Sequence, residues 1–287
     1  MRTTTERKAR VGLSAAVMAW AFGVLPCAWA TGNIDPTNKN AWTENTGWAN
    51  AAPTNGGVTV HFNGTSGYLT GYAWGENIGW IKLGDNPGGP YANTSATDWG
   101  VNLDGAGNLS GYAWGENVGW IKCDPAHSAV TIDMATGRFQ GDAWGENIGW
   151  VRFKGTAPDY SIRTLAFDKQ PQGTPNWWLA LYGIGDESNI GIKGIPAWQD
   201  YVADTDPTNP TSYFRIAAIS NLPSATVYFP SSSRRYYTLE RRDNLLVGDW
   251  TNVPTQTVIP GGGGLDSLQD TTVATQQFYR VQVKVSP

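Results

Sequence analysis

The residues best suited to chemistry in this sequence form one motif that is written four times. Residues Ala41–Trp48 read AWTENTGW, and closely similar segments begin at Ala73, Ala113 and Ala143. Each copy places a glutamate and an asparagine between two tryptophans. Four of the six glutamates beyond residue 30 stand at this position. A carboxylate beside a carboxamide, flanked by aromatic rings, is a combination that can bind a ligand or close a turn.

Three interpretations of this motif stay open from the residues alone. In the first it is structural: glutamate accepts the N–H groups of a turn, asparagine tolerates a left-handed turn residue and the tryptophans pack as a cross-strand core. In the second the rings stack on sugars while glutamate and asparagine bond to hydroxyl groups. In the third the carboxylates bind calcium or are catalytic, but glycoside hydrolysis needs two carboxylates in unlike environments, which four equal copies do not supply. The candidate ligand-binding residues are Trp74, Glu76, Asn77, Trp80, Trp114, Glu116, Asn117, Trp120, Trp144, Glu146, Asn147 and Trp150.

Strand-type alternation and glycine turns predict how these residues are positioned. In the last three copies a β-branched or alternating segment precedes a glycine turn, and a second strand runs into the Trp pair. The exit strand directs Ile81 inward and Trp80 and Lys82 to the opposite face. Cys123 occupies the place of an inward residue in other copies, so we expect a small buried hydrophobe rather than a reactive thiol. The glycine before the second Trp of every copy is expected to need positive φ or close backbone approach.

Residues 1–30 have the features of a secretory signal peptide. A basic head precedes an apolar run, Val11–Leu25, and the small residues Ala28 and Ala30 mark a cleavage site after Ala30. The run is shorter than the roughly 20 residues that span a bilayer, which argues against an uncleaved membrane anchor. No second long apolar segment follows it, so we expect no membrane span after cleavage. Loss of four basic residues and one acidic residue takes the formal net charge from -4 to -7 and leaves Cys123 without an internal disulfide partner. We therefore expect an extracellular or cell-surface protein, with the periplasm as the alternative.

The rest of the chain divides into three expected parts of mainly β character. A Trp-rich β-repeat domain over 31–156 is predicted to form a barrel or a short solenoid, ahead of a propeller. A linker over 157–210 carries a helical pair, and 211–287 form an antiparallel β-sandwich. Strands in the sandwich are expected at 213–216, 225–229, 236–241, 250–253 and 278–283.

Three segments resemble known families. The repeats, over about residues 33–154, resemble the GYAWGENIGWI repeats of large secreted bacterial proteins, a family without an established activity. The linker is similar to the paired calcium loops of thrombospondin type 3 and dockerin-like segments. Its two loops would begin at Asp168 and Asn189, but they lack most of the acidic ligands and place Lys193 at a ligand position. The resemblance therefore implies a helical pair without tight calcium binding. The weak candidates for a metal are Asp200, Asp204 and Asp206. The sandwich resembles immunoglobulin-like or fibronectin-like modules.

The functional prediction is a binding protein rather than an enzyme. The chain is 15% charged and 40% hydrophobic, which argues against a disordered chain and against a nucleic-acid binder. It carries no sequence motif of a hydrolase, metalloprotease, redox or nucleotide enzyme. We expect a non-enzymatic secreted or cell-surface binding or adhesion module without a cofactor, whose partner is an extracellular polysaccharide or a surface protein. The alternatives are a purely structural extracellular spacer and, third, a carbohydrate-active enzyme that pairs a motif glutamate with Asp104 or Asp133.

Overall fold

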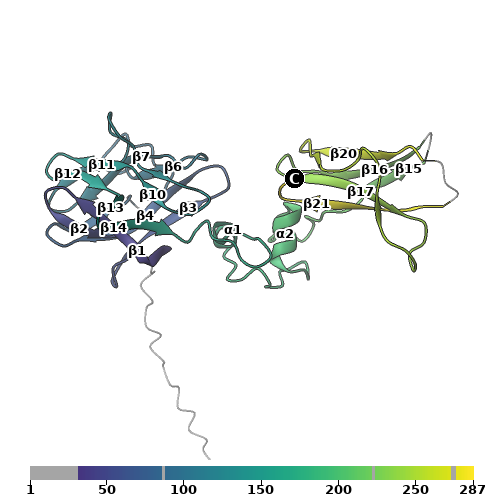
Figure 1. The fold of residues 1–287 in the computed structure, drawn as a ribbon, viewed down its shortest axis with the longest axis horizontal. Coiled ribbons are helices and arrows are strands. Elements are labelled where there is room, and N and C mark those ends of the chain that lie inside the picture. Colours follow the sequence, from purple (N-terminus) through teal and green to yellow (C-terminus); the bar gives the residue numbers. More distant parts are fainter. Residues whose placement is uncertain (1–31, 86–87, 222–223, 273–275) are drawn as a thin grey trace, which may run out of the picture.

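The computed structural model describes residues 32–85, 88–221, 224–272 and 276–287, so the expected signal peptide lies outside the described residues. Strands dominate these ranges, with two short helices between two groups of β-sheets (Figure 1). The expectation of a mainly β protein with a helical connector is therefore confirmed. Neither helix of the described ranges has the length and apolar character that crossing a membrane requires.

Four β-hairpins, one for each copy of the motif, form a closed ring of antiparallel strands. The second strand of each hairpin pairs with the first strand of the next, and the last strand pairs with the first. Closure explains how four hairpins share one interior. The hairpins are β1 (Ile34–Thr43) with β2 (Gly47–Asn50), β4 (Gly67–Gly75) with β5 (Gly79–Lys82), β7 (Leu109–Gly115) with β8 (Gly119–Lys122), and β11 (Asp142–Gly145) with β12 (Gly149–Arg152).

The two tryptophans of each motif face each other across their hairpin, as in the pair Trp42 and Trp48. The glycine before the second Trp has a left-handed φ in every copy: +84° at Gly47, +77° at Gly79, +79° at Gly119 and +73° at Gly149. Other residue types adopt this conformation at a cost, which confirms the expected need for positive φ.

Further strands lie beside the hairpins. β3 (Gly57–Phe62) and β6 (Val101–Leu103) extend the ring sheet by pairing with the long strand β4, whereas β9 (Thr131–Ile132) and β10 (Phe139–Gln140) pair with each other in a separate two-stranded sheet. After the last hairpin, β13 (Lys154–Thr156) and β14 (Asp159–Thr164) form one more, and β14 pairs with β1. The sheet thus continues beyond residue 156.

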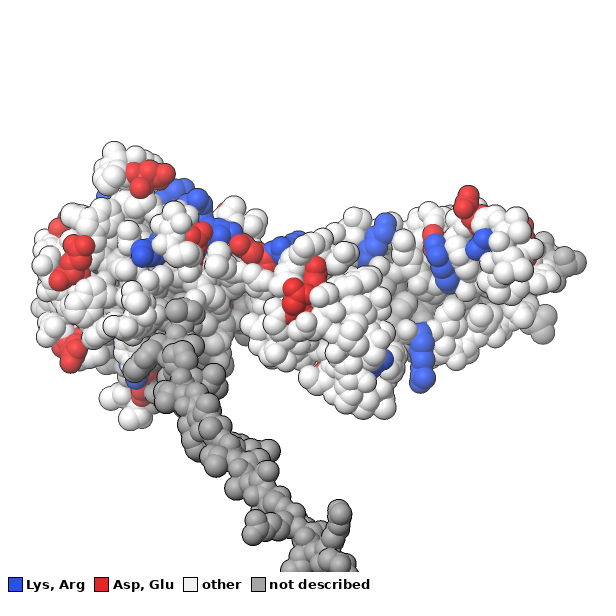
Figure 2. All heavy atoms as spheres, turned by 90° about the horizontal axis from the view of Figure 1, so that it is seen from below, with Lys and Arg blue, Asp and Glu red and all other residues white. Residues whose placement is uncertain are grey.

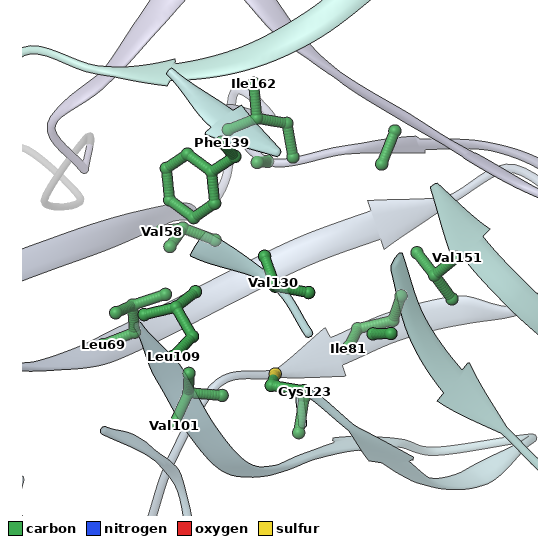
Figure 3. Packing of buried hydrophobic residues seen from close by; sticks show 14 of the residues in the cluster. Val58, Leu69, Ile81, Val101, Leu109, Cys123, Val130, Phe139, Val151 and Ile162 are labelled. Carbon is green, nitrogen blue, oxygen red and sulfur yellow. The ribbon is translucent and has the colours of Figure 1, made fainter. Parts of the chain in front are cut away.

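Inward residues of the ring strands fill one apolar core. Val58, Ile81, Leu109 and Val151 come from different strands and converge in its interior (Figure 3). The first residue of each motif is an inward alanine, whereas both tryptophans point to the outer face, as period-2 alternation requires. Cys123 is 4% exposed in this core, and its burial, with a smaller effect of Asp124, raises the pKa of the thiol to about 12. The expectation that Cys123 is a small buried hydrophobe is confirmed.

The connector and the sandwich have hydrophobic clusters of their own. The helices are α1 (Asn176–Leu181) and α2 (Ala197–Ala203). One sheet of the sandwich contains β15 (Ala218–Ser220), β16 (Ala225–Pro230) and β20 (Leu265–Asp270). In the other sheet, β17 (Tyr236–Arg242) lies between β21 (Phe278–Lys284) on one side and β18 (Thr251–Asn252) and β19 (Ile259–Pro260) on the other.

One strand prediction in the sandwich is wrong. Residues 213–216 form no strand, and the ladder to β16 begins only at the hydrogen bond from the Ala217 N–H to the Tyr228 carbonyl. The apolar alternation there has another cause. Phe214 packs against Phe229 and Tyr237, with ring centroids 5.9 and 5.7 Å apart, so the segment inserts a side chain into the core without a partner strand.

Candidate functional site

The four Glu-Asn turns meet at one end of the ring. The Glu76 and Glu116 N–H groups donate to the carbonyl of the second Trp in the preceding copy, over 3.0 and 3.1 Å. The Glu44 N–H donates to the Trp150 carbonyl over 2.9 Å, which links the first copy to the fourth. The third and fourth copies are linked by the Asn147 side chain, which donates to the Val118 carbonyl, so each turn of the rim contacts the next.

The asparagines of this rim have a structural task. Asn77, Asn117 and Asn147 each donate a side-chain N–H to a carbonyl oxygen of the preceding turn, over 3.0 Å in all three cases. The residue that follows each of these asparagines, Ile78, Val118 or Ile148, is buried beneath the rim. Because these amides already donate to neighbouring turns, they stabilise the rim, and these N–H groups are not available to bind a ligand.

The motif glutamates are exposed, and the structure does not pair them with the carboxylates considered for catalysis. Asp104 follows β6, and the length of β7 separates its turn from Glu116 at the other end of that strand. The Asn108 side chain, opposed by partial burial and helped by backbone N–H groups, lowers the pKa of Asp104. Hydrogen bonds from Thr136 and Ala135 likewise lower the pKa of Asp133 in its own turn. Both aspartates thus cap their own loops in ionised form.

The motif tryptophans form a belt around the outside of the ring. Within each hairpin the two rings meet edge to face, with centroids 4.7 to 4.9 Å apart. Trp48, Trp80 and Trp150 are half-buried. The other five motif tryptophans are 37 to 42% exposed: Trp42, Trp74, Trp114, Trp120 and Trp144. The belt is therefore neither a buried core nor a set of free side chains. Each ring packs edge to face against its partner and keeps part of its surface exposed to solvent.

Between the second and third hairpins the belt is hollowed into a groove of about 760 Å³. Lys82 of β5 lies opposite Trp114 of β7 in the strand register, and the Tyr72 and Trp80 rings pack edge to face at 6.1 Å. A further wall is main chain at Gly56, where an added Cβ would lie 3.1 Å from the Trp80 ring. We call this surface the 2/3 groove; it is lined by Asn55, Gly56, Gly57, Gly71, Tyr72, Trp80, Lys82, Trp114 and Glu116.

The 2/3 groove combines aromatic surface with a few polar groups. Trp80, Trp114 and Tyr72 supply rigid rings, and the Glu116 carboxylate can accept hydrogen bonds. The Lys82 ammonium is held by Asp85 at 2.8 Å, and it lies 5.5 Å from the centre of the Trp99 ring. Rings for stacking, with a small number of oriented polar groups, are the usual composition of a small-molecule or oligomer site.

Only some of the residues expected from the motif reach this groove. Trp80, Trp114 and Glu116 line it, and the structure brings them together from two different copies. The remaining predicted members lie elsewhere on the belt or rim. Tyr72, Lys82 and the glycines were not among the predicted site residues. Alternation already put Lys82 on the face of Trp80, but the pairing of β5 with β7 was needed to oppose it to Trp114.

The weak metal candidates of the connector are occupied by protein groups. Asp200 accepts from the Lys193 ammonium and the Thr205 hydroxyl, and it is 1% exposed. Asp204 accepts from Arg234 and from the Ser232 hydroxyl of the sandwich. Asp206 accepts from the N–H and hydroxyl of Thr208 at 2.8 and 2.7 Å. Within the described ranges, no three or more His, Cys, Asp or Glu residues are grouped to hold a metal ion.

Charge is sparse on the molecule, and the face shown in Figure 2 presents wide areas without Lys, Arg, Asp or Glu. The chain matches no family model, no curated protein and no solved structure. The geometry of the belt therefore carries the functional argument by itself.

Proposed function

We propose that this protein is a non-enzymatic binding module of the secreted or cell-surface kind, and that the 2/3 groove binds an extracellular polysaccharide. The observation that carries the proposal is the meeting of Trp114 with Tyr72, Trp80 and Glu116 in an open groove. Each sugar ring has an apolar face of C–H groups, which an aromatic ring can cover, and an equatorial edge of hydroxyls, which a carboxylate can bind. A surface groove of about 760 Å³ has room for more than one sugar unit, so we expect it to accept a segment of a chain.

The exposure of the tryptophans supports binding over packing alone. Trp114 is 37% exposed although it is a large apolar side chain on a well-packed sheet. Clusters of exposed aromatic surface are unusual on a protein without a partner, since they are better stabilised by contact than by water. The partner ring Trp120, 4.7 Å away, fixes the orientation of Trp114 and lowers the conformational entropy that binding must remove.

A second candidate function is a structural spacer, and a separate observation favours it for part of the motif. The asparagine amides are bonded to neighbouring turns, as a stabilising element requires. The two functions are compatible within one chain, because the Glu-Asn rim closes the end of the ring and the Trp belt covers its side. A surface protein remains the alternative ligand.

Binding can be tested with a matched pair of tryptophan variants. Trp114 and Trp144 occupy the same motif position and are both 37% exposed, but only Trp114 lines the 2/3 groove. Affinity electrophoresis through a panel of neutral soluble polysaccharides, followed by calorimetry on those that retard the protein, measures the effect. We expect Trp114→Ala to weaken binding about tenfold, the loss common for a central aromatic contact, and Trp144→Ala to leave it unchanged.

Two results would refute the proposal. One is the absence of retardation of the unmodified protein by every polysaccharide of the panel. The other is an equal loss in both variants, because a loss shared by Trp144→Ala reflects the stability of the belt and not contact with a ligand. Thermal unfolding of the two variants in parallel verifies that their folded states are comparable.

A further inference from the structure

A second groove lies where the ring closes. Trp42 of β1 is opposite Arg152 of β12 in the strand register, the same relation that Trp114 has to Lys82. The surface there is hollowed to about 700 Å³, and the β13–β14 hairpin forms one wall. We call it the 4/1 groove. The lining residues that matter for its chemistry are Trp42, Trp48, Asp142, Arg152, Lys154 and Tyr160.

The aromatic part of the 4/1 groove is continuous across three rings. Trp48 meets Trp42 on one side and Tyr160 on the other, each edge to face with centroids 4.9 Å apart. Trp42 is 39% exposed, so it presents a surface as open as that of Trp114. This groove therefore offers the same kind of stacking platform as the 2/3 groove, with a ring contributed by the additional hairpin.

The two grooves differ in charge. Arg152 uses Nε to bond Asp142, 3.3 Å away, and its side chain is 57% exposed. Lys154, two residues further along the chain at the start of β13, is exposed as well. For the part of the chain that the structure describes, no hydrogen bond or ion pair engages the Lys154 ammonium or the two terminal nitrogens of Arg152. Two cations thus face one carboxylate here, whereas in the 2/3 groove Lys82 is matched by Asp85 and Glu116 is the only other charge of the lining.

The order of strands places the grooves on opposite sides of the ring. In one direction the hairpins β7–β8 and β11–β12 separate them, and in the other direction β1–β2 and β4–β5 do. One polysaccharide strand lying along one groove therefore leaves the other groove accessible.

We propose that the 4/1 groove binds an anionic sugar segment, so that the ring carries two independent glycan sites of different charge preference. The inference rests on the proposed function, because it uses the motif tryptophans as stacking surfaces in both places. The guanidinium of Arg152 presents two N–H groups in the fork that suits a carboxylate or a sulfate ester, and Lys154, two residues further along the chain, adds a second cation to the lining.

The test measures binding to two anionic glycans, polygalacturonate for the carboxylate and κ-carrageenan, a sulfated galactan without carboxylates, for the sulfate ester. The variant is Arg152→Gln with Lys154→Gln, and both positions are exposed, so the fold is expected to persist. The control is Lys122→Gln with Lys169→Gln, which removes the same net charge; Lys122 has the strand position of Arg152 in another copy, opposite Trp144. We expect the first variant to weaken binding to the retained anionic glycan about tenfold and to reduce its salt dependence, and the control to change neither.

The outcomes separate this inference from the function on which it rests. Retention by either anionic glycan that depends on Arg152 and Lys154 supports the site, and the glycan retained identifies the anionic group. No retention by either glycan, or an equal loss in the control, overturns it. In that case the proposed function is still supported if Trp114→Ala weakens binding to a neutral polysaccharide. If the unmodified protein binds no neutral polysaccharide, the proposed function is refuted, independently of the result for the 4/1 groove. Trp114→Ala is expected to leave anionic binding unchanged, and a loss in that variant would contradict the independence of the two grooves.

Discussion

Replacement of Lys193 by methionine is expected to destabilise the connector strongly. The Lys193 side chain is fully buried, and its ammonium donates to Asp200, to the Thr205 hydroxyl at 3.3 Å and to the Ser212 carbonyl at 2.6 Å. Methionine has a similar length but no charge. Asp200, whose side chain is 1% exposed, would remain as a buried carboxylate without its cation. Breaking one side of such a pair costs about 3 to 5 kcal/mol in free energy of unfolding.

A comparison with the first loop of the connector indicates which second substitution should compensate for the loss of the Lys193 charge. The two loops have equivalent hydrogen bonds, from the Trp177 N–H to the Ala166 carbonyl and from the Trp198 N–H to the Glu187 carbonyl. In that alignment Leu179 stands at the position of Asp200 and Gln172 at that of Lys193. The double variant Lys193→Met with Asp200→Leu removes both charges and leaves mainly the Ser212 carbonyl without its donor. An unsatisfied buried polar group costs about 1 to 3 kcal/mol, so the second change is expected to restore roughly 2 kcal/mol.

Hydrogen exchange detected by mass spectrometry on peptides that cover α2 measures local opening of the connector separately from the two β parts. Exchange should accelerate in Lys193→Met and slow again in the double variant. Lys169→Met, at an exposed lysine of the first loop, serves as the control and should leave exchange unchanged. A double variant that opens as readily as the single one would refute the argument, because the cost would then not arise from the uncompensated carboxylate.

Two further predictions concern a turn and an acidic residue. Gly149→Ala should lower the free energy of unfolding by about 1 to 2 kcal/mol in thermal or urea denaturation, because φ is +73° and the new Cβ would lie 2.9 Å from the Asn45 side chain; an unchanged stability would contradict this. Burial opposes ionisation of Asp270, but bonds from the Thr272 N–H and Arg241 outweigh it and lower its pKa. Stability should therefore fall as pH drops below 3.8 through the folded-state pKa, and urea denaturation across this range should show a shallower fall in Asp270→Asn.

Much of the hairpin structure was predictable from local sequence. Alternation placed Ile81 inside the ring and Trp80 and Lys82 outside, and the glycine before the second Trp indicated a left-handed turn. These features depend on neighbours within a few residues, where side-chain direction and backbone preference act directly. The same reasoning failed for residues 213–216. The apolar alternation there reflects the packing of Phe214 against Phe229, and the segment pairs with no strand.

The candidate site was predictable only as a list of residue types. The motif identified Trp80, Trp114 and Glu116, but it gave all four copies equal standing. The structure distinguishes them, since Trp114 lines the 2/3 groove and Trp144 does not. The difference comes from segments outside the motif. The main chain near Gly56 forms a wall of the 2/3 groove, and the β13–β14 hairpin forms a wall of the 4/1 groove.

The sequence by itself determined the repeated strand–turn–strand unit, the opposite directions of Ile81 and Trp80, and the burial of Cys123, because each follows from local alternation and turn chemistry. Tertiary structure alone decided that the fourth hairpin returns to the first, where the Glu44 side chain meets the Trp150 N–H across 106 residues of chain. It also decided which junctions became grooves and how they are charged. Such pairings depend on the register between distant strands, which is set by the shared core and the connecting loops together and which no single repeat encodes.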